Sequence, residues 1–333
     1  MFSGFQIKGR DISHIGHALQ RPEAVKTKRD GSIWACDARG FVRIEADGRQ
    51  EIIGDPTYTG YADQKDVNIR MSDGLLPTGF TFTESGDIIF AAYGEQRVCR
   101  MSPQGEVSTF LREVEGVELT RPNFVMRDKQ DRYWIVVSTR VFDWPKKILS
   151  TPQEVFTGFV VLAEGGKARI VADGLRFANE CRIDNDGRYF YIAESFGPYV
   201  SRFRLGADGS LSAREQFGPA FDGPIDGIAF DQGRNLWVTQ PLLERLVVLS
   251  PEGKATVIAD FSNAAALADQ HAAVAAGKFD FNIAARCASP EFAVPTSIAF
   301  GGDDLKTVYV GSLLGERIAC FRSPVAGVPA VFW

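Results

Sequence analysis

Short apolar runs alternate with turn signals along the whole chain. The clearest copy runs from Phe177 to Glu194, where two apolar segments flank the turn Asn185-Asp186-Gly187. Such a turn takes up left-handed backbone at low cost, so it is typical of a tight β-hairpin. A polar amide, Asn179, stands where the first of the two strands begins. The pattern predicts a hairpin that carries a polar side chain at its entrance.

The same unit recurs six times with a nearly constant spacing. Nine residues separate an anchor at the start of the first strand from the following turn, as in Pro22 to Gly31 and Pro77 to Gly86. The six anchors are Pro22, Pro77, Pro122, Ala178, Ile225 and Pro295, and the turn of the last copy is slightly longer. Most copies continue with a third and a fourth strand, so four short strands recur roughly every 40–50 residues, which is typical of propeller blades. We predict an all-β fold, a six-bladed β-propeller closed by its terminal strands, as a single domain over residues 1–333. A β-sandwich or a barrel is the alternative.

Two stretches interrupt this rhythm. Residues 140–156 form an excursion inside the third blade, and residues 260–290 form another between the fifth and sixth blades. In the second, the alanine-rich segment 264–276 predicts a short helix, with Ser262 or Asn263 as its cap and Gly277 at its end. Such a helix is not stable alone. We therefore expect it to cover the mouth of a pocket or to join two copies into a homodimer.

Composition and charge exclude several classes of function. The 37 basic and 42 acidic residues give 37 − 42 = −5, so no basic field is available for nucleic acid or for an anionic membrane. The N-terminal residues show no leader pattern, and no apolar run approaches the length of a spanning helix. The five cysteines are scattered and form no CxxC pair. Free thiols in a reducing cytoplasm are the expectation.

The position one residue after each anchor carries a side-chain oxygen in all six copies. The residues are Glu23, Thr78, Asn123, Asn179, Asp226 and Thr296. The innermost strands of a propeller line its central channel, so these side chains should form a ring. Two carboxylates in such a ring repel each other unless a cation lies between them. An all-oxygen set favours one hard divalent cation: Ca²⁺ is preferred, Mg²⁺ or Mn²⁺ are alternatives, and Zn²⁺ requires waters to complete its shell.

Each of these residues could also be explained by a purely structural role. Glu23 could be a surface carboxylate, and Asn179 or Asp226 could belong to turns. Thr78 and Thr296 are β-branched residues that strands favour without any functional reason. The turn of the fifth copy lies later in the sequence than Asp226, which favours a functional role for this carboxylate.

Five segments make the chain resemble the senescence marker protein/gluconolactonase (LRE-like) family. They are Arg21-Pro22-Glu23, Arg121-Pro122-Asn123, Asn179 before Asp186-Gly187, the run from Ile225 to Asp231, and the run from Pro295 to Gly302. The resemblance spans nearly the whole chain in order and register. It implies a six-bladed propeller with one divalent cation in its channel, and hydrolysis of a lactone.

The resemblance also implies roles for single residues. Glu23, Asn179 and Asp226 would be the metal ligands, and Asp226 is our candidate general base. Asn123 and Arg121 would bind the substrate. Two positions depart from the family pattern, since Phe124 replaces an Asp and Glu180 replaces a Gly. Together with Phe142 and Trp144 of the third-blade excursion, these departures favour a more apolar cyclic ester than a sugar lactone.

The sequence thus predicts a metal-dependent hydrolase that opens a lactone. Two alternatives remain open. The cation could instead stabilise an enolate or another oxyanion in a lyase or isomerase reaction, or the propeller could bind ligands without catalysis. The gathering of carboxylates at the axis argues against the non-catalytic alternative.

Overall fold

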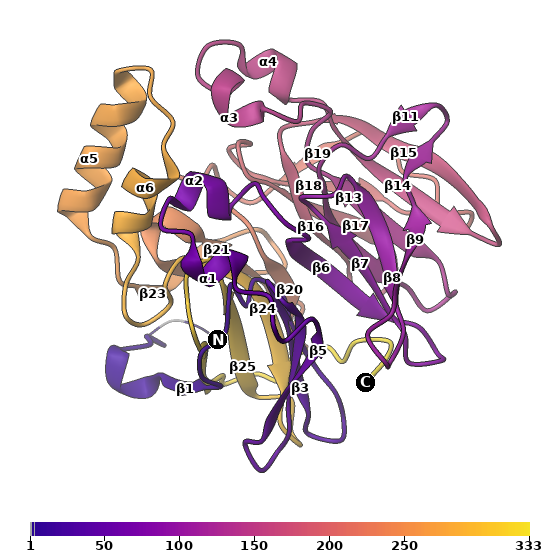
Figure 1. Cartoon of the computed structure of the whole chain (residues 1–333), viewed down its shortest axis with the longest axis horizontal. Coiled ribbons are helices and arrows are strands. Elements are labelled where there is room, and N and C mark those ends of the chain that lie inside the picture. The colour runs from indigo at the N-terminus through magenta and orange to yellow at the C-terminus, as the bar shows by residue number, and fades with distance from the viewer. Residues whose placement is uncertain (1, 3) are drawn as a thin grey trace.

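Six four-stranded sheets are arranged as the blades of a β-propeller in the computed structural model, which describes residue 2 and residues 4–333 (Figure 1). Within each blade, neighbouring strands are antiparallel, and in the first five blades the strand that comes first along the chain is the innermost. This confirms the predicted fold. The short strands form because their β-branched and aromatic residues bury both faces of each sheet between neighbouring blades.

The strand boundaries follow the predicted repeat. The first three blades contain β2 (Val25–Thr27), β3 (Ile33–Asp37), β4 (Gly40–Ile44) and β5 (Gln50–Gly54), then β6 (Pro77–Phe82), β7 (Ile88–Ala92), β8 (Arg97–Met101) and β9 (Val107–Leu111), then β12 (Pro122–Arg127), β13 (Tyr133–Val137), β14 (Gly158–Glu164) and β15 (Lys167–Leu175). The fourth and fifth blades contain β16 (Ala178–Ile183), β17 (Tyr189–Glu194), β18 (Val200–Arg204) and β19 (Glu215–Phe217), then β20 (Ile228–Phe230), β21 (Leu236–Gln240), β22 (Arg245–Leu249) and β23 (Ala255–Asp260). A small hairpin of β10 (Glu113–Val114) and β11 (Val117–Glu118) leads into the third blade.

The sixth blade closes the ring with strands from both ends of the chain. It contains β24 (Pro295–Gly301), β25 (Thr307–Ser312) and β26 (Ile318–Arg322), and its outermost strand is β1 (Ser13–Ile15). Strand β1 pairs antiparallel with β26, with Ser13 opposite Cys320. Because this pairing joins the N-terminal segment to the last blade, the predicted closure by terminal strands is confirmed.

Hydroxyl groups join the innermost strands of neighbouring blades. Thr78 donates to the backbone carbonyl of Asn123, and Thr296 donates to that of Glu23. Thr239 in turn donates to the carbonyl of Thr296 over 2.6 Å. The oxygen-bearing side chain therefore has a structural role in two of the six ring positions. It holds the backbone of Asn123 and Glu23 in place at the axis.

Three helical insertions lie over one end of the propeller. The first contains α1 (Gly60–Asp63) and α2 (Val67–Arg70), the second α3 (Trp144–Lys147) and α4 (Pro152–Val155), and the third α5 (Ala264–Ala275), α6 (Phe281–Ala284) and the 3₁₀ turn η3 (Ala285–Cys287) (Figure 1). Two further 3₁₀ turns are η1 (Gly9–Asp11) and η2 (Pro241–Leu243). Helix α5 confirms the predicted helix: the Asn263 side chain caps it by accepting from the Ala266 amide over 3.1 Å, and Gly277 follows its end.

The helices α1 and α2 are absent from the sequence-based prediction. Each is only one turn long, so neither shows a helical period in the sequence. Asn68 of α2 donates from its amide to the carboxylate of Asp280 over 3.0 Å, which ties the first insertion to the third. The three insertions thus form one cover, which we call the cap: residues 58–74, 140–156 and 260–290.

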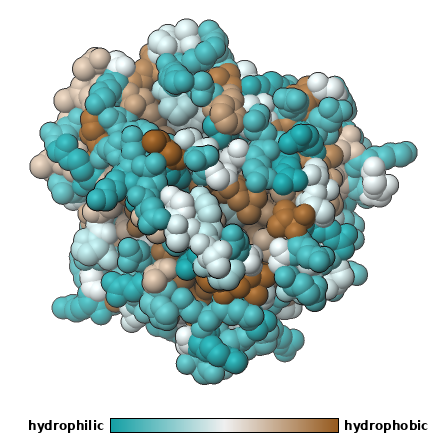
Figure 2. Space-filling model, in the orientation of Figure 1, coloured by the Kyte–Doolittle hydropathy of each residue, from teal (hydrophilic) through white to brown (hydrophobic). Residues whose placement is uncertain are grey.

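The outer surface is mixed in character. On the face drawn in Figure 2, exposed hydrophobic residues form small separate patches among hydrophilic ones. None of the helices in the described part of the chain has the length and apolar character needed to cross a membrane. All five cysteines are free, as expected from their scattered positions.

Glu244 fixes the third cap insertion to the fifth blade. Its buried carboxylate accepts from the Ser289 hydroxyl over 2.7 Å and from the Val294 amide over 2.6 Å. Its backbone is left-handed, with φ of 48°, which is costly for a residue other than glycine. Burial is the largest influence on this carboxyl and raises its pKa from 4.5 to about 7.

We expect Glu244 to make the protein less stable as the pH rises from 4.5 towards 7. In this window the folded chain keeps the proton that the unfolded chain has already released, so the free energy of unfolding falls with rising pH. Substitution Glu244→Gln, which keeps one acceptor and does not titrate, should reduce this fall by on the order of 2–3 kcal/mol. Urea unfolding between pH 4 and 8 measures the free energy of unfolding of each variant, with substitution of the exposed Glu106, Glu106→Gln, as the control. An identical pH profile in wild type and Glu244→Gln would contradict the assignment.

Candidate functional site

The innermost strands begin at the end of the channel that the cap covers. A cavity of about 170 Å³ lies there, between the strand starts and the cap. Four of the predicted site residues line it: Glu23, Asn123, Asn179 and Asp226. These residues come from four different blades and are far apart in the sequence. The register of the repeat therefore brings them to one place.

Arg121 lies outside this cavity. It is 2% exposed, and its guanidinium donates to the carbonyl of Phe142 over 2.9 and 3.1 Å and to that of Tyr93 over 3.1 Å. The guanidinium also stacks on the Phe142 ring, 3.8 Å from its centroid. Arg121 thus holds the second cap insertion against the second blade, and these contacts occupy the donors that a substrate would need.

Arg21 is instead the one basic side chain among the described residues that line the cavity. Its Nη1 donates to the carbonyl of Pro77 over 3.0 Å, and its Nη2 forms a buried ion pair with Glu23. Its backbone is left-handed, with φ of 62°. Two other residues that precede ring positions, Phe177 and Val294, share this backbone state and also line the cavity. Leu76, before the second anchor, is left-handed as well but does not line the cavity, so the strained turn by itself does not bring a side chain to the cavity wall.

Burial raises the pKa of both carboxyls in the cavity. For Asp226 the rise is large; desolvation contributes most, and the charges of Glu23 and Glu180 add to it, while Arg21 and the Asn179 amide oppose it. For Glu23, desolvation also contributes most, Arg21 opposes it, and Glu180 adds to it. Both carboxyls therefore keep their protons more readily than an exposed carboxyl does, unless a cation beside them offsets the cost of burial.

Asn179 and Glu180 are neighbours on β16 with different roles. The Asn179 amide donates to the Ser195 hydroxyl over 3.2 Å at the cavity wall. Glu180 does not line the cavity; its Oε2 is 2.8 Å from Nη2 of Arg182 and accepts from the Ile228 amide over 3.2 Å. The Glu180 carboxylate is therefore held outside the cavity by Arg182 and by the backbone of the fifth blade.

The roof of the cavity is aromatic. Trp144 of α3 packs against Phe177, with ring centroids 4.5 Å apart, and against Phe279 at 5.2 Å and Phe281 at 5.9 Å. Its indole N–H donates to the Tyr93 hydroxyl over 2.8 Å. The second and third cap insertions thus meet in one aromatic cluster, which lines the same cavity as the carboxylates. Phe142, named with Trp144 in the sequence, is 40% exposed and lies outside the cavity lining.

The cavity residues fit a hard cation. Glu23 and Asp226 each supply carboxylate oxygens and Asn179 supplies an amide oxygen, and no cysteine or histidine is found among the described residues that line the cavity. Glu23 Oε2 is buried and makes no hydrogen bond of good geometry within the described chain, although it pairs with Arg21. Among the described residues, no group of three His, Cys, Asp or Glu side chains is arranged for a metal ion. Binding of a cation by Glu23, Asn179 and Asp226 would therefore depend on the Asn179 amide oxygen and on water to complete the ligand shell.

Several cavity residues were missed from the sequence. Arg21 occupies the position before the anchor, as Arg121 does in the third blade, so the repeat itself could have identified it. Trp144 was named from the sequence, but Phe279 and Phe281 were not, because the third cap insertion has no repeat register. Their contact with Trp144 depends on the packing of two separate insertions.

The fold and the site define a β-propeller with an axial carboxylate–amide cavity, and the comparisons place it in a family. The sequence profile of the SMP-30/Gluconolactonase/LRE-like region matches residues 58–268, so the chain belongs to this family. A comparison with curated proteins gave no match.

Solved structures share the fold at low sequence identity. A luciferin-regenerating enzyme has a TM-score of 0.69 with 15% identity, over 96% of this chain and 98% of its own. A gluconolactonase from Xanthomonas campestris has a TM-score of 0.66 with 14% identity, over 94% and 89%. A calcium-binding protein, regucalcin, from Agrobacterium tumefaciens has a TM-score of 0.65 with 14% identity, over 95% and 95%. At this level of sequence identity, the similarity to these structures shows a shared fold.

We expect Arg21→Met to destabilise the protein by about 3–5 kcal/mol, because it leaves the buried Glu23 charge without its partner. The side chains of this pair are only 6% and 10% exposed. Adding Glu23→Gln to Arg21→Met should recover much of this loss. Urea unfolding in the presence of chelator measures the effect.

The control is Arg322→Met, which removes an ion pair with Asp304 whose side chains are 60% and 49% exposed. This variant should change stability by less than about 1 kcal/mol. An effect of Arg21→Met no larger than that of the control would contradict the buried pair.

Proposed function

We propose that this protein is a divalent-cation-dependent hydrolase that opens small, apolar lactones. The observation that carries the proposal is the cavity itself. Two carboxylates of raised pKa and an amide oxygen gather at the propeller axis, directly beneath an aromatic roof. The family membership and the shared fold support lactone hydrolysis as the reaction class.

Glu23, Asn179 and Asp226 would hold the cation, with Ca²⁺ the preferred ion for an all-oxygen set. The bound cation would polarise the ester carbonyl and stabilise the negative charge that develops on it. It would also offset the repulsion between the two buried carboxylates.

Asp226 is the proposed general base. Burial raises the pKa of Asp226 above that of an exposed aspartate, which makes its ionised carboxylate the stronger base. Its carboxylate takes a proton from water as the water oxygen bonds to the carbonyl carbon. When the ring C–O bond breaks, Asp226 returns the proton to the departing alkoxide. The product is a hydroxy acid, and atoms and charge balance.

Asn123 and Arg21 would orient the substrate. The side chain of each reaches the wall of the cavity, and the amide and the guanidinium both carry hydrogen-bond donors. Arg21 stands in this proposal where the sequence suggested Arg121, because the donors of Arg121 are already bonded to backbone carbonyls.

The volume and the lining restrict the substrate. A cavity of about 170 Å³ is close to the size of a cavity of roughly 150 Å³ that accepts benzene. Most of the wall is apolar, so the hydroxyl groups of a sugar lactone would lose their hydrogen bonds to water without replacement. A monocyclic lactone with hydrogen or short alkyl substituents fits this chemistry better than an aldonolactone.

A panel of lactones with a pH indicator tests the reaction. We expect acid release from small γ- and δ-lactones, its loss with chelator, and its recovery with Ca²⁺. Asp226→Ala should remain folded but lose roughly 10²–10⁴-fold in kcat/KM together with cation binding, whereas Asp304→Ala on the surface should change neither. Chelator-insensitive hydrolysis, or full turnover by Asp226→Ala, would contradict the proposal. Formation of an unsaturated acid in place of the hydroxy acid would favour the lyase alternative.

The aromatic roof should set the size limit. We expect Phe281→Ala to enlarge the cavity and to shift the ratio of kcat/KM between a long-chain and an unsubstituted lactone by roughly tenfold towards the long-chain substrate. Val274→Ala on exposed α5 of the same insertion is the matched control and should leave the ratio unchanged. Equal selectivity in Phe281→Ala and wild type would contradict a role for the roof.

A further inference from the structure

A second, larger cavity lies at the opposite end of the channel. Its volume is about 660 Å³, within the range of roughly 300–1,000 Å³ that is usual for small-molecule sites. The last residues of the innermost strands line it: Thr27, Thr81, Arg127, Ile183, Phe230 and Phe300. No described residue lines both cavities. On β12 the two environments are adjacent, since Asn123 faces the first cavity and Phe124 faces the second.

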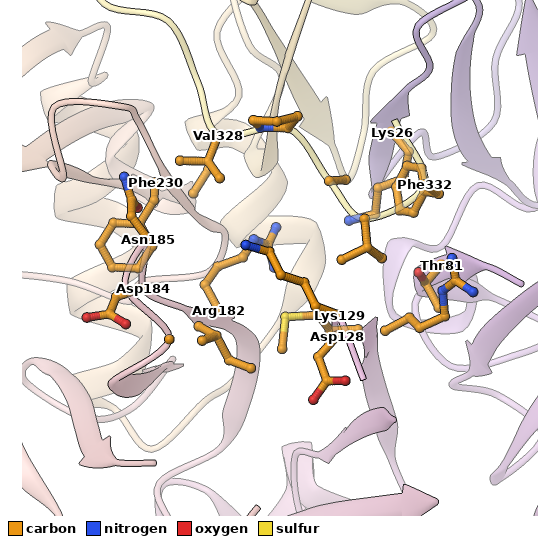
Figure 3. Close-up of a pocket in the computed structure, with 18 of the residues that line it drawn as sticks. Lys26, Thr81, Asp128, Lys129, Arg182, Asp184, Asn185, Phe230, Val328 and Phe332 are labelled. Carbon is orange, nitrogen blue, oxygen red and sulfur yellow. The ribbon is translucent and has the colours of Figure 1, made fainter. Parts of the chain in front are cut away.

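The C-terminal segment 328–332 forms one side of this second cavity (Figure 3). The Val328 amide donates to the carbonyl of Phe230 over 3.1 Å, and the preceding Gly327 amide donates to that of Leu305 over 2.8 Å. The Phe332 ring packs edge-on against Phe82, with centroids 5.1 Å apart. The segment is therefore held in place by specific contacts and gives the cavity an apolar wall.

Lys26 of β2 is a cation at the wall without an anionic partner. It makes no ion pair or hydrogen bond with any described residue, and its ammonium lies 4.9 Å from the centroid of Phe124 and 5.8 Å from that of Phe80. Burial, followed by the charge of Arg182, lowers the pKa of Lys26 to about 8. The ammonium is still largely protonated at neutral pH, and an anion beside it would offset its desolvation.

The other charges at this wall are mostly balanced by neighbours. Asp128 pairs with Arg132 at 2.7 Å, Arg127 with Asp131 at 3.1 Å, and Asp186 with Arg234 at 2.7 Å. Arg182, whose guanidinium lies 4.8 Å from the Phe124 centroid, is bonded to Glu180. Asp184 accepts from the backbone amides of its own turn.

Lys129 adds a second positive charge. It has no ion-pair partner among the described residues, and Figure 3 shows its side chain and that of Arg182 extending into the cavity. The charges left without a partner at this wall are therefore predominantly positive. They stand among aromatic and aliphatic side chains.

We propose that the second cavity binds a small organic monocarboxylate with an apolar body, whose carboxylate pairs with Lys26 and whose body packs between Phe124, Phe230 and the C-terminal segment. A carboxylate would supply the hydrogen-bond acceptors that Lys26 lacks. The apolar walls would bury the rest of the ligand, and the volume admits a body of one or two rings. The site is separate from the carboxylate–amide cavity, so its occupancy does not depend on the proposed hydrolysis.

Calorimetric titration of the full chain with cinnamate, in the presence of chelator, tests this inference. We expect cinnamate to bind, and the uncharged, nearly isosteric cinnamamide to bind at least about tenfold more weakly, because one charge-assisted interaction is lost. Lys26→Met, which keeps the length and apolar stem of the side chain, should weaken cinnamate binding by a similar factor. Val328→Trp, at an exposed position that fills the cavity from its rim, should weaken it as well.

Asp226→Ala is the matched control for location, since it alters only the first cavity and should leave the affinity for cinnamate unchanged. No cinnamate binding at millimolar concentration would overturn the proposal, as would equal binding of cinnamate and cinnamamide. Loss of binding in Asp226→Ala with retention in Val328→Trp would place the ligand at the other end of the channel and would also overturn it. Should Lys26→Met fail to fold, the comparison of cinnamate with cinnamamide and the Val328→Trp variant decide the same question.

Discussion

The repulsion between buried carboxylates at the propeller axis is the constraint on which the site depends. Glu23 and Asp226 line one small cavity, and Glu180 adds a third negative charge behind them. Desolvation raises the pKa of both lining carboxyls, so their ionised forms need positive charge nearby. Arg21 supplies part of it to Glu23. A divalent cation shared by Glu23, Asn179 and Asp226 would supply the rest, and this need links the fold to the proposed chemistry.

The fold meets this constraint through the register of its innermost strands. Each strand brings its first residues to the capped end of the channel and its last residues to the opposite end. Hydroxyls of Thr78 and Thr296 hold the backbone at Asn123 and Glu23, so the ligand-bearing positions are fixed by neighbouring blades. The cap then excludes water from the carboxylates with aromatic side chains, which strengthens every electrostatic interaction inside. The same architecture leaves Lys26 at the other end, among apolar walls.

The sequence repeat made much of the fold and of the candidate site predictable. Its spacing identified the six blades and their closure by terminal strands, and its register brought Glu23, Asn123, Asn179 and Asp226 to one cavity. The alanine-rich composition of 264–276, where the repeat is interrupted, identified helix α5. What the repeat could not predict lies outside its register. The helices α1 and α2 are too short to leave a period, and the aromatic roof arises where the second and third insertions meet in three dimensions. The donors of Arg121 turned out to be bonded to carbonyls of its own surroundings, which a motif alone does not reveal.

The most direct measurement of the central claim is an anomalous difference map from crystals of the protein grown with Mn²⁺ in place of Ca²⁺. The account predicts one strong peak in the capped cavity, within about 2.6 Å of side-chain oxygens from Glu23, Asn179 and Asp226. A map without a peak at these three residues, or with the ion bound elsewhere while Arg21 alone balances Glu23, would contradict it.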